Sequence, residues 1–402
     1  MFLYDQRAFS SPYDNDGENG APSSSEPTTP PLITAVARAP LEYENETLNV
    51  ELFGMGWGIE NDETSTTLNT TKNILLFIPG VCESVETWTV QNLAQICLRE
   101  QWMLAVLELP GHGLSSGERS LLQPTGRVGL EKLVDIVVTF ARHVVNIVGC
   151  TDHAVINVNL AMSGCSLGGV LAAYASPKIA QAIHLSRSNP QTQSKEPSNS
   201  DRFQQYPGFE TLNFVGSILL SPAVGVAPQA VPPPLIVSAL SFLAYIAPSA
   251  ALMTPTEDPS HYNCPTKSRR NFSGLWPLGT SKLLLDITAE IVPHDIAKSM
   301  GDDDEKDTNG FCCNSPEIVF DSVVIAGKQD QVVPMDKVQA FVNAINHRRK
   351  GNFLHATLVE VPNGGHGLLV PQSVGKKSKV VEETSRHIQE ALKRFANTST
   401  NR

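Results

Sequence analysis

Short runs of mostly apolar residues recur along the chain and predict buried strands, since a strand covered on both faces needs no polar alternation. The segment 48–53 is predicted as one of the first strands. The later runs lie at 73–78, 103–107, 154–162, 214–220, from residue 321 onward and at 356–361. Residues 125–148 and 380–396 instead repeat apolar side chains at helical spacing. Strands that alternate with amphipathic helices predict a domain of the α/β class.

A glycine-rich turn that carries a serine follows the run 154–162, with the sequence Gly-Cys-Ser-Leu-Gly-Gly at 164–169. Apolar residues follow and predict the start of a helix. A strand, a sharp turn and a helix form the context in which G-x-S-x-G presents a nucleophilic serine, here Ser166. Side chains at Gly164 or Gly168 would collide with the neighbouring strand or helix. The alternative is a strand-to-helix turn without a catalytic role, as in any α/β protein.

A serine hydroxyl needs a base that takes its proton and an acid that holds the base. After such a turn, the partners follow in the order serine, acid, histidine. Asp330 follows the strand that begins near residue 321, and His366 lies in a glycine-rich loop after the strand at 356–361. Ligands of open α/β sheets gather beyond the carboxyl ends of the strands. We therefore expect Ser166, Asp330 and His366 to form a catalytic triad there.

Other acids and histidines compete for these roles. Asp321 precedes its strand and would lie at the wrong edge of the sheet. Asp336 is expected at the start of the next helix, where a carboxylate is ordinary. His112 and His294 are rival bases, but neither follows a late strand.

A serine hydrolase also needs donors for the oxyanion of its tetrahedral intermediate. One is expected to be the backbone N–H of Leu167, directly after the serine, and the other comes from the loop after an early strand. The strand at 73–78 is followed by Pro79 and Gly80, so the N–H of Val81 is the second predicted donor. A plain Pro-Gly turn is the alternative.

Five segments in one order carry a resemblance to a known family. The chain resembles α/β-hydrolases of the monoacylglycerol lipase and lysophospholipase group, often grouped with serine aminopeptidases. The similar segments are the oxyanion loop at 79–84, the P-G-H-G-x-S-x-G-E-R segment at 109–119, the serine turn at 164–169, the acid loop at 327–334 and the histidine loop at 365–366.

The resemblance implies an α/β-hydrolase fold, with a mostly parallel central sheet flanked by helices and a helical cap inserted after the sixth core strand.

Three positions depart from the family's pattern. Pro79 stands where the family usually has histidine, Cys165 replaces a histidine before the serine, and Glu108 replaces an aspartate. These changes affect the inference of the family's substrate specificity for this chain more than the inference of its catalytic mechanism.

The predicted organisation follows from composition and from this resemblance. Residues 1–40 are rich in Ser, Pro, Asp and Gly and are expected to form a disordered tail. The first part of the core is expected at 41–224, with a polar insertion at about 186–206. The cap is expected at 225–316, and the second part of the core at 317–402.

The composition narrows the class of protein. The 402 residues are 41% hydrophobic and carry a net charge of −11, without a Lys/Arg-rich run, so a nucleic-acid partner is not expected. The seven cysteines are scattered, and no apolar export segment begins the chain. A cytoplasmic protein is the simplest expectation. The acidic segment 302–313 lacks the glutamate of a calcium loop, so no metal site is expected.

The expected cap contains an apolar helix. Residues 211–256 hold no charged residue, and the segment 235–246 gives about three helical turns, too few to span a bilayer. We expect Leu235, Phe242 and Ile246 to contact substrate and to make transient contact with a membrane surface. The alternative is a helix buried in a small core of its own.

The function that these features predict is hydrolysis of a lipid-like carboxylic ester, of the monoacylglycerol or lysophospholipid type, without a metal or organic cofactor. An aminopeptidase of the same fold is one alternative, although it would need acidic groups in the cap. A non-catalytic ligand-binding protein on a hydrolase fold is the other. The sequence leaves acyl length, head group and oligomeric state open.

Overall fold

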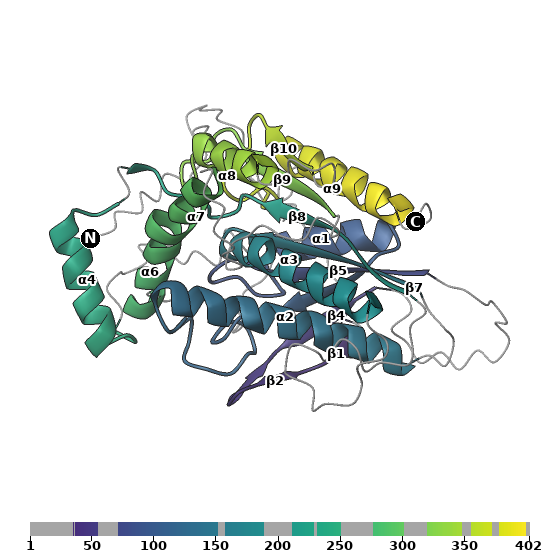
Figure 1. Ribbon diagram of the computed structural model, residues 1–402, viewed down its shortest axis with the longest axis horizontal. Helices are drawn as coiled ribbons and strands as arrows, with labels where there is room; N and C mark the ends of the chain where they lie inside the picture. The colour runs from purple at the N-terminus through teal and green to yellow at the C-terminus, as the bar shows by residue number, and fades with distance from the viewer. Residues whose placement is uncertain are drawn as a thin grey trace, which may run out of the picture.

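The computed structural model describes residues 35, 37–54, 71–151, 157–188, 211–228, 231–250, 276–300, 320–347, 355–371 and 378–398. These residues form one large sheet, a separate hairpin and helices on both faces of the large sheet (Figure 1). The hairpin pairs β2 (Leu41–Tyr43) with β3 (Glu46–Leu48).

Over the described residues, the large sheet has eight strands in the order β1-β4-β6-β5-β7-β8-β9-β10. Their bounds are β1 (Ala37–Arg38), β4 (Val50–Phe53), β5 (Thr71–Ile78), β6 (Met103–Leu107), β7 (Asn157–Cys165), β8 (Thr211–Leu220), β9 (Asp321–Gly327) and β10 (Ala356–Val361). The strands from β6 to β10 run parallel, whereas β1 and β4 pair antiparallel at one edge. The loops after β5, β7, β9 and β10 therefore gather at one edge of the sheet.

Hydrophobic packing on both faces explains the continuous apolar runs. On β5, Ile74, Leu76 and Ile78 belong to one core, whereas Leu75 and Phe77 belong to the other. Successive side chains of a strand point to opposite faces. A central strand buried on both faces therefore needs apolar residues at every position.

Five of the helices in the described part of the chain cover the two faces of the sheet. They are α1 (Trp88–Arg99), α2 (Gly126–Thr151), α3 (Leu167–Ser188), α8 (Met335–His347) and α9 (Lys379–Thr398). One core lies beneath α2, α3 and α8, and the other beneath α1 and α9. The helical periodicity expected on α2 is confirmed, since Leu133, Ile136 and Phe140 are all buried. On α9, Val380 is buried at the first turn, whereas the expected Val381 is only half-buried.

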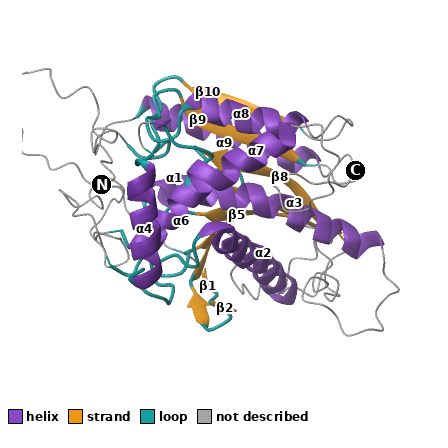
Figure 2. Ribbon diagram, turned by 60° about the vertical axis from the view of Figure 1, so that its left-hand side comes forward, coloured by secondary structure: helices purple, strands orange, loops and turns teal. Residues whose placement is uncertain are grey.

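A further group of helices lies between β8 and β9 in the chain. It comprises α4 (Pro234–Ile246), α6 (Leu278–Leu285), the π-helix η4 (Asp286–Ile291) and α7 (Val292–Met300). Helix α4 is the outermost and packs on α6 (Figures 1 and 2). A small core of Leu240, Ala244, Leu278 and Leu285 joins the two helices.

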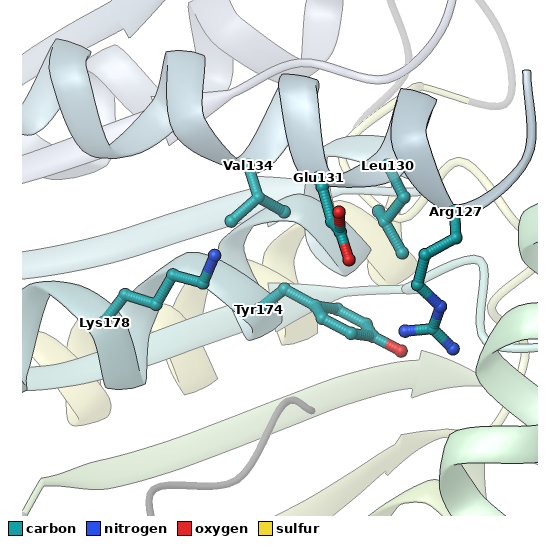
Figure 3. Close-up of a pocket in the computed structure, with 6 residues that line it drawn as sticks. All are labelled: Arg127, Leu130, Glu131, Val134, Tyr174 and Lys178. Carbon is teal, nitrogen blue, oxygen red and sulfur yellow. The ribbon is translucent and has the colours of Figure 1, made fainter. Parts of the chain in front are cut away.

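Polar contacts fix α7 and η4 on the core helices. Arg127 of α2 donates two hydrogen bonds to Asp295 of α7, at 2.9 and 2.7 Å. The hydroxyl of Tyr174 on α3 donates to the same carboxylate at 2.6 Å, and Figure 3 shows Tyr174 and Arg127 side by side. The N–H of Gly126 donates to Asp286 at 2.9 Å. The inner part of this helical group is thus bound to α2 and α3 by polar contacts, whereas α4 packs on α6 through apolar side chains.

The structure differs from the sequence-based expectations at two boundaries. Residues 37–38 form β1, which pairs with β4, so this part of the disordered tail expected over 1–40 is instead an ordered strand. Backbone pairing and partial burial of Ala37 against the core order this segment. Helix α3 continues to Ser188, so the polar insertion expected from residue 186 begins inside a helix.

Several expectations fall outside the described residues. They concern 1–34 of the tail, 189–206 of the polar insertion, the acidic segment 302–313, and the cap segments 251–275 and 301–316. Among the helices that the structure describes, none combines the length and the apolar character that a membrane crossing requires.

Candidate active site

Ser166 occupies the sharp turn between β7 and α3, and its backbone is strained. Its φ angle is 52°, in the left-handed region that side-chain-bearing residues rarely adopt. A Cβ atom on Gly164 would lie 2.1 Å from the carbonyl oxygen of Gly168, and one on Gly168 would lie 2.0 Å from that of Ile78. The two glycines therefore permit a turn that other residues would block.

The neighbouring strand holds this strained serine from both sides. The N–H of Ser166 donates to the carbonyl oxygen of Leu220 at 3.0 Å, and the N–H of Ala223 donates to the carbonyl oxygen of Ser166 at 3.0 Å. Between these two contacts lies Ser221, which also has a positive φ of 39°. The exit of β8 thus fixes both backbone groups of Ser166, which keeps its side chain at the edge of the sheet.

The structure brings His366 and Asp330 to Ser166. The Nε2 atom of His366 lies 3.0 Å from the Oγ atom of Ser166. The Nδ1 atom of His366 lies 2.9 Å from a carboxylate oxygen of Asp330. Three residues from the ends of β7, β9 and β10 therefore form one continuous chain of hydrogen bonds. In this geometry an imidazole that donates through Nδ1 can accept the serine proton at Nε2.

The loops that carry the acid and the histidine support one another. The Asp330 carboxylate accepts hydrogen bonds from the N–H groups of Val332 and Val333, at 2.8 and 2.9 Å. A Cβ atom on Gly327 would lie 2.1 Å from the carbonyl oxygen of Gly364, so the loops after β9 and β10 touch through their backbones. This close approach sets the position of Asp330 relative to the histidine loop.

Charge around His366 favours its protonated form. Burial disfavours a charged imidazole, but the charge of Asp330, its hydrogen bond and the charge of Glu83 outweigh burial. The pKa of His366 is therefore raised above its ordinary value near 6.5. An imidazole with these neighbours accepts a proton more readily than an isolated one, which suits a general base.

The rival acids and bases lie elsewhere. Asp321 begins β9, at the opposite end of the strand from Asp330, and pairs with Arg394 at 3.2 Å. Asp336 lies in the first turn of α8. His294 is on α7 with a largely exposed side chain. His112 is buried, with Nδ1 2.8 Å from the carbonyl oxygen of Pro110, and burial lowers its pKa to about 4.

The two predicted oxyanion donors belong to segments that flank the serine. Leu167 is the first residue of α3, so its N–H has no acceptor within the helix. Val81 follows Gly80, on which a Cβ atom would lie 3.4 Å from the Cβ atom of Ser166. No hydrogen bond between described residues uses the N–H of Val81. Both donors are thus near Ser166, as an oxyanion hole requires.

Glu108, which departs from the family's pattern, supports the loop that follows β6. It is fully buried and accepts hydrogen bonds from the N–H groups of Leu114 and Val85, at 2.7 and 3.0 Å, and from the Asn49 amide at 2.8 Å. Gly113 has a φ of 54°, and a Cβ atom there would overlap this carboxylate. The longer acid therefore fills the space beneath the loop at 109–119.

The predicted cap residues are exposed on the outer helix of the cap. Leu235, Phe242 and Ile246 all belong to α4, with 82%, 63% and 56% of their surface accessible to solvent. Leu240 and Ala244 form the inner face of the same helix. Only part of α4 is therefore buried in a core of its own, and an apolar face without charge remains at the surface.

A small cavity lies between α2 and α3 (Figure 3). It is lined by Arg127, Leu130, Glu131, Val134, Tyr174 and Lys178. None of the predicted site residues belongs to this lining. Over the part of the chain that the structure describes, no cluster of three or more histidine, cysteine, aspartate or glutamate side chains is arranged to hold a metal ion.

One residue of the site had no role in the sequence-based predictions. Glu83 lies in the segment 79–84 that resembles the family's oxyanion loop, but its spacing from Gly80 says nothing about where the carboxylate points. In the structure it contacts Gly80 and Cys165, and its charge acts on His366. Its place in the similar segment at 79–84 was the only signal available.

Solved structures of known proteins share the fold of this chain. No protein-family model matches the sequence, and no curated protein matches it. Among solved structures, a soluble variant of monoglyceride lipase from Saccharomyces cerevisiae, in complex with a substrate analogue, is 11% identical, with a TM-score of 0.54. The match covers 93% of this chain and 99% of the lipase. DcsB, in complex with its substrate analogue, is 11% identical over 89% of this chain and 98% of DcsB, with a TM-score of 0.50.

At these low sequence identities, the structural similarity establishes the fold, and the activity has to be inferred from the geometry of the site. The order of the strands, the turn at Ser166 and the helices between β8 and β9 are those of an α/β-hydrolase fold. The expectation of this fold from the sequence is confirmed.

Proposed function

We propose that the chain is a serine hydrolase that cleaves a lipid-like carboxylic ester through an acyl-enzyme intermediate. The observation that carries this proposal is the chain of hydrogen bonds from Ser166 through His366 to Asp330, at 3.0 and 2.9 Å. A strained turn, a buried acid and a histidine with a raised pKa have no evident role in a purely structural protein.

The reaction follows from the positions of these groups. Ser166 attacks the ester carbonyl carbon while His366 takes its proton, and the N–H groups of Val81 and Leu167 bind the developing oxyanion. Asp330 stabilises the imidazolium, which then protonates the leaving alcohol. Water, deprotonated by His366, attacks the acyl-enzyme and releases the carboxylic acid, and the proton returns to Ser166.

The apolar surface of the cap favours a substrate with an apolar acyl chain. Helix α4 presents Leu235, Phe242 and Ile246 to solvent and carries no charge. A monoacylglycerol or lysophospholipid offers an acyl chain that such a surface can receive. Full burial of each large side chain contributes about 1.5–3 kcal/mol, which suffices for transient contact with a membrane surface. We propose that the segment 225–316 acts as this cap on a core formed by 41–224 and 317–402.

An aminopeptidase of the same fold is the second candidate within this class of enzyme. It requires a free carboxylate near the site to hold the substrate ammonium. Among the described cap residues, Asp286 accepts from Lys282 and Gly126, and Asp295 is bound by Arg127 and Tyr174, so both carboxylates are committed. Glu290 of η4 is exposed. The uncharged helix α4 favours an ester substrate. We also propose a cytoplasmic location, which the free thiols of Cys82, Cys97 and Cys165 favour.

The proposal is tested by comparing turnover of nitrophenyl acyl esters of increasing chain length with turnover of an aminoacyl nitroanilide. An esterase should favour the acyl esters, with an optimum at a medium or long chain, and Ser166→Ala should abolish the reaction. Preference for the nitroanilide would instead support the aminopeptidase. Absence of both reactions would favour a non-catalytic ligand-binding protein.

A further inference from the structure

The Glu83 carboxylate joins three segments that surround Ser166. It accepts a hydrogen bond from the N–H of Gly80 at 2.6 Å and one from the Thr89 hydroxyl at 2.7 Å. The thiol of Cys165, the residue before the nucleophile, donates to the same carboxylate at 3.3 Å. Because donors from the loop after β5, from α1 and from the end of β7 all converge on it, the side chain of Glu83 has a fixed position.

The same residue sets the direction of the peptide between Gly80 and Val81. The backbone N–H of Glu83 donates to the carbonyl oxygen of Gly80 at 3.3 Å, while its side chain holds the N–H of Gly80. In a trans peptide the carbonyl and the following N–H point in opposite directions. The N–H of Val81 therefore points away from Glu83, and the loop cannot turn this donor without breaking contacts to Glu83.

Glu83 also lies close enough to the reacting groups to act on them electrostatically. A Cβ atom on Gly80 would lie 3.1 Å from its carboxylate and 3.4 Å from the Cβ atom of Ser166. Among the described residues, the charged groups that act on the His366 imidazole are Asp330, from the loop after β9, and Glu83, from the loop after β5. Reaction turns this imidazole into a cation, so a second carboxylate whose charge acts on it stabilises the charge that develops.

The thiols around Glu83 remain protonated, which makes them donors. Burial and then the charge of Glu83 raise the pKa of the Cys165 thiol well above its ordinary range. Burial likewise raises the pKa of the Cys82 thiol. The neutral Cys165 thiol is therefore one of the donors that orient the Glu83 carboxylate.

We propose that Glu83 is a positioning residue of this active site, which aims the Val81 N–H at the oxyanion and shares with Asp330 the stabilisation of the His366 imidazolium. This inference rests on the proposed serine hydrolase function. It assigns two separable contributions to Glu83, one from its contacts and one from its charge.

Two substitutions separate these contributions. Glu83→Gln keeps the shape of the side chain: the amide oxygen can still accept from Gly80 and Cys165, and the amide nitrogen can donate to the Thr89 hydroxyl, so only the charge is lost. Glu83→Ala removes both the charge and the contacts. The matched control is Glu390→Gln, which removes an exposed carboxylate from α9.

The first measurement is the pKa of His366 by NMR titration, with its signal assigned by comparison with His366→Asn. This readout needs no substrate. We expect the pKa of His366 to fall by about half a unit or more in Glu83→Gln and to stay unchanged in Glu390→Gln. An unchanged pKa in Glu83→Gln would overturn the electrostatic role.

The second measurement is the rate at which a fluorophosphonate probe labels Ser166, followed as a function of pH. In Glu83→Gln the acid limb should move to lower pH while the plateau rate stays within about threefold of the wild type. In Glu83→Ala the plateau rate should fall by about tenfold or more, because the Val81 donor loses its support. A wild-type plateau rate in Glu83→Ala would overturn the positioning role.

These readouts distinguish failure of the inference from failure of the proposed function. If the wild type does not react with the probe, the serine hydrolase proposal fails, and the NMR titration still decides whether Glu83 acts on His366. If Glu83→Ala does not fold, Glu83→Asp takes its place, since the shorter side chain keeps the charge but withdraws from Gly80. A slower plateau rate in Glu83→Asp then supports the positioning role, and a wild-type rate contradicts it.

Discussion

The Nε2 atom of His366 lies 3.0 Å from the Oγ atom of Ser166, although 200 residues separate them in the chain. The parallel order of β7, β8, β9 and β10 makes this contact possible, because each of these strands ends at the same edge of the sheet. The contact carries the proposed chemistry, since a serine hydroxyl reacts only when a base can take its proton.

The pH dependence of turnover should report the state of His366. The base must be neutral, and its pKa is raised above about 6.5, so kcat/KM should rise with pH through a midpoint above 6.5. Asp330→Asn removes the charge and the hydrogen bond that raise this pKa. In that variant the midpoint should shift to lower pH and the plateau rate should fall about 10³-fold or more. A pH–rate profile measures both, and an acid limb that Asp330→Asn does not move would contradict the assignment.

The serine turn should tolerate no side chain at its two tightest glycines. Gly164→Ala and Gly168→Ala each place a Cβ atom about 2 Å from a carbonyl oxygen. Each variant should lose at least about 2 kcal/mol of stability to unfolding in urea, because the backbone must move. Gly365→Ala is the control, since no atom lies within 4 Å of its Cβ position. Equal stability of all three variants would show that the turn is looser than described.

Buried His112 should make the protein sensitive to acid. Its pKa is lowered to about 4, whereas in the unfolded chain it is about 6.5. The unfolded state therefore binds more protons between these values, so the stability contributed by neutral His112 is present above pH 6.5 and is lost as pH falls toward 4. The loss amounts to at most about 3 kcal/mol. Urea unfolding at pH 7 and pH 4.5 should show a smaller difference for His112→Gln than for the wild type.

The exposed face of α4 should bind lipid surfaces. Replacing Leu235 and Phe242 with serine removes two large apolar side chains that are 82% and 63% exposed. Partition onto phosphatidylcholine vesicles, measured by co-sedimentation, should weaken by about tenfold or more. Leu185→Ser, on α3, is the matched control because Leu185 is also half exposed but lies outside the cap. Equal partition of both variants and the wild type would show that the exposed face of α4 does not bind lipid surfaces.

The fold was predictable because its signals are local. Each central strand needs apolar residues on both faces, and the G-x-S-x-G turn needs glycines at fixed positions, so β7, α3 and Ser166 could be placed from short segments. The ends of β9 and β10 then placed Asp330 and His366 at the same edge.

Interactions between distant segments left no such local pattern. The hydrogen bond between Arg127 and Asp295 joins α2 to α7 across 168 residues, and no sequence pattern near either residue predicts it. The role of Glu83 depends on donors from three segments. The exposure of α4 depends on which of its faces α6 covers, and its uniformly apolar sequence does not reveal that face.

The most direct test of Ser166 as the nucleophile is the intact mass of the protein after incubation with a fluorophosphonate probe, with digestion to locate the modified residue. We expect one added phosphonyl group, located on Ser166, and no addition in Ser166→Ala or at a pH well below the pKa of His366. A wild-type protein that stays unmodified above that pKa, or that carries the label on another residue, would contradict this role of Ser166.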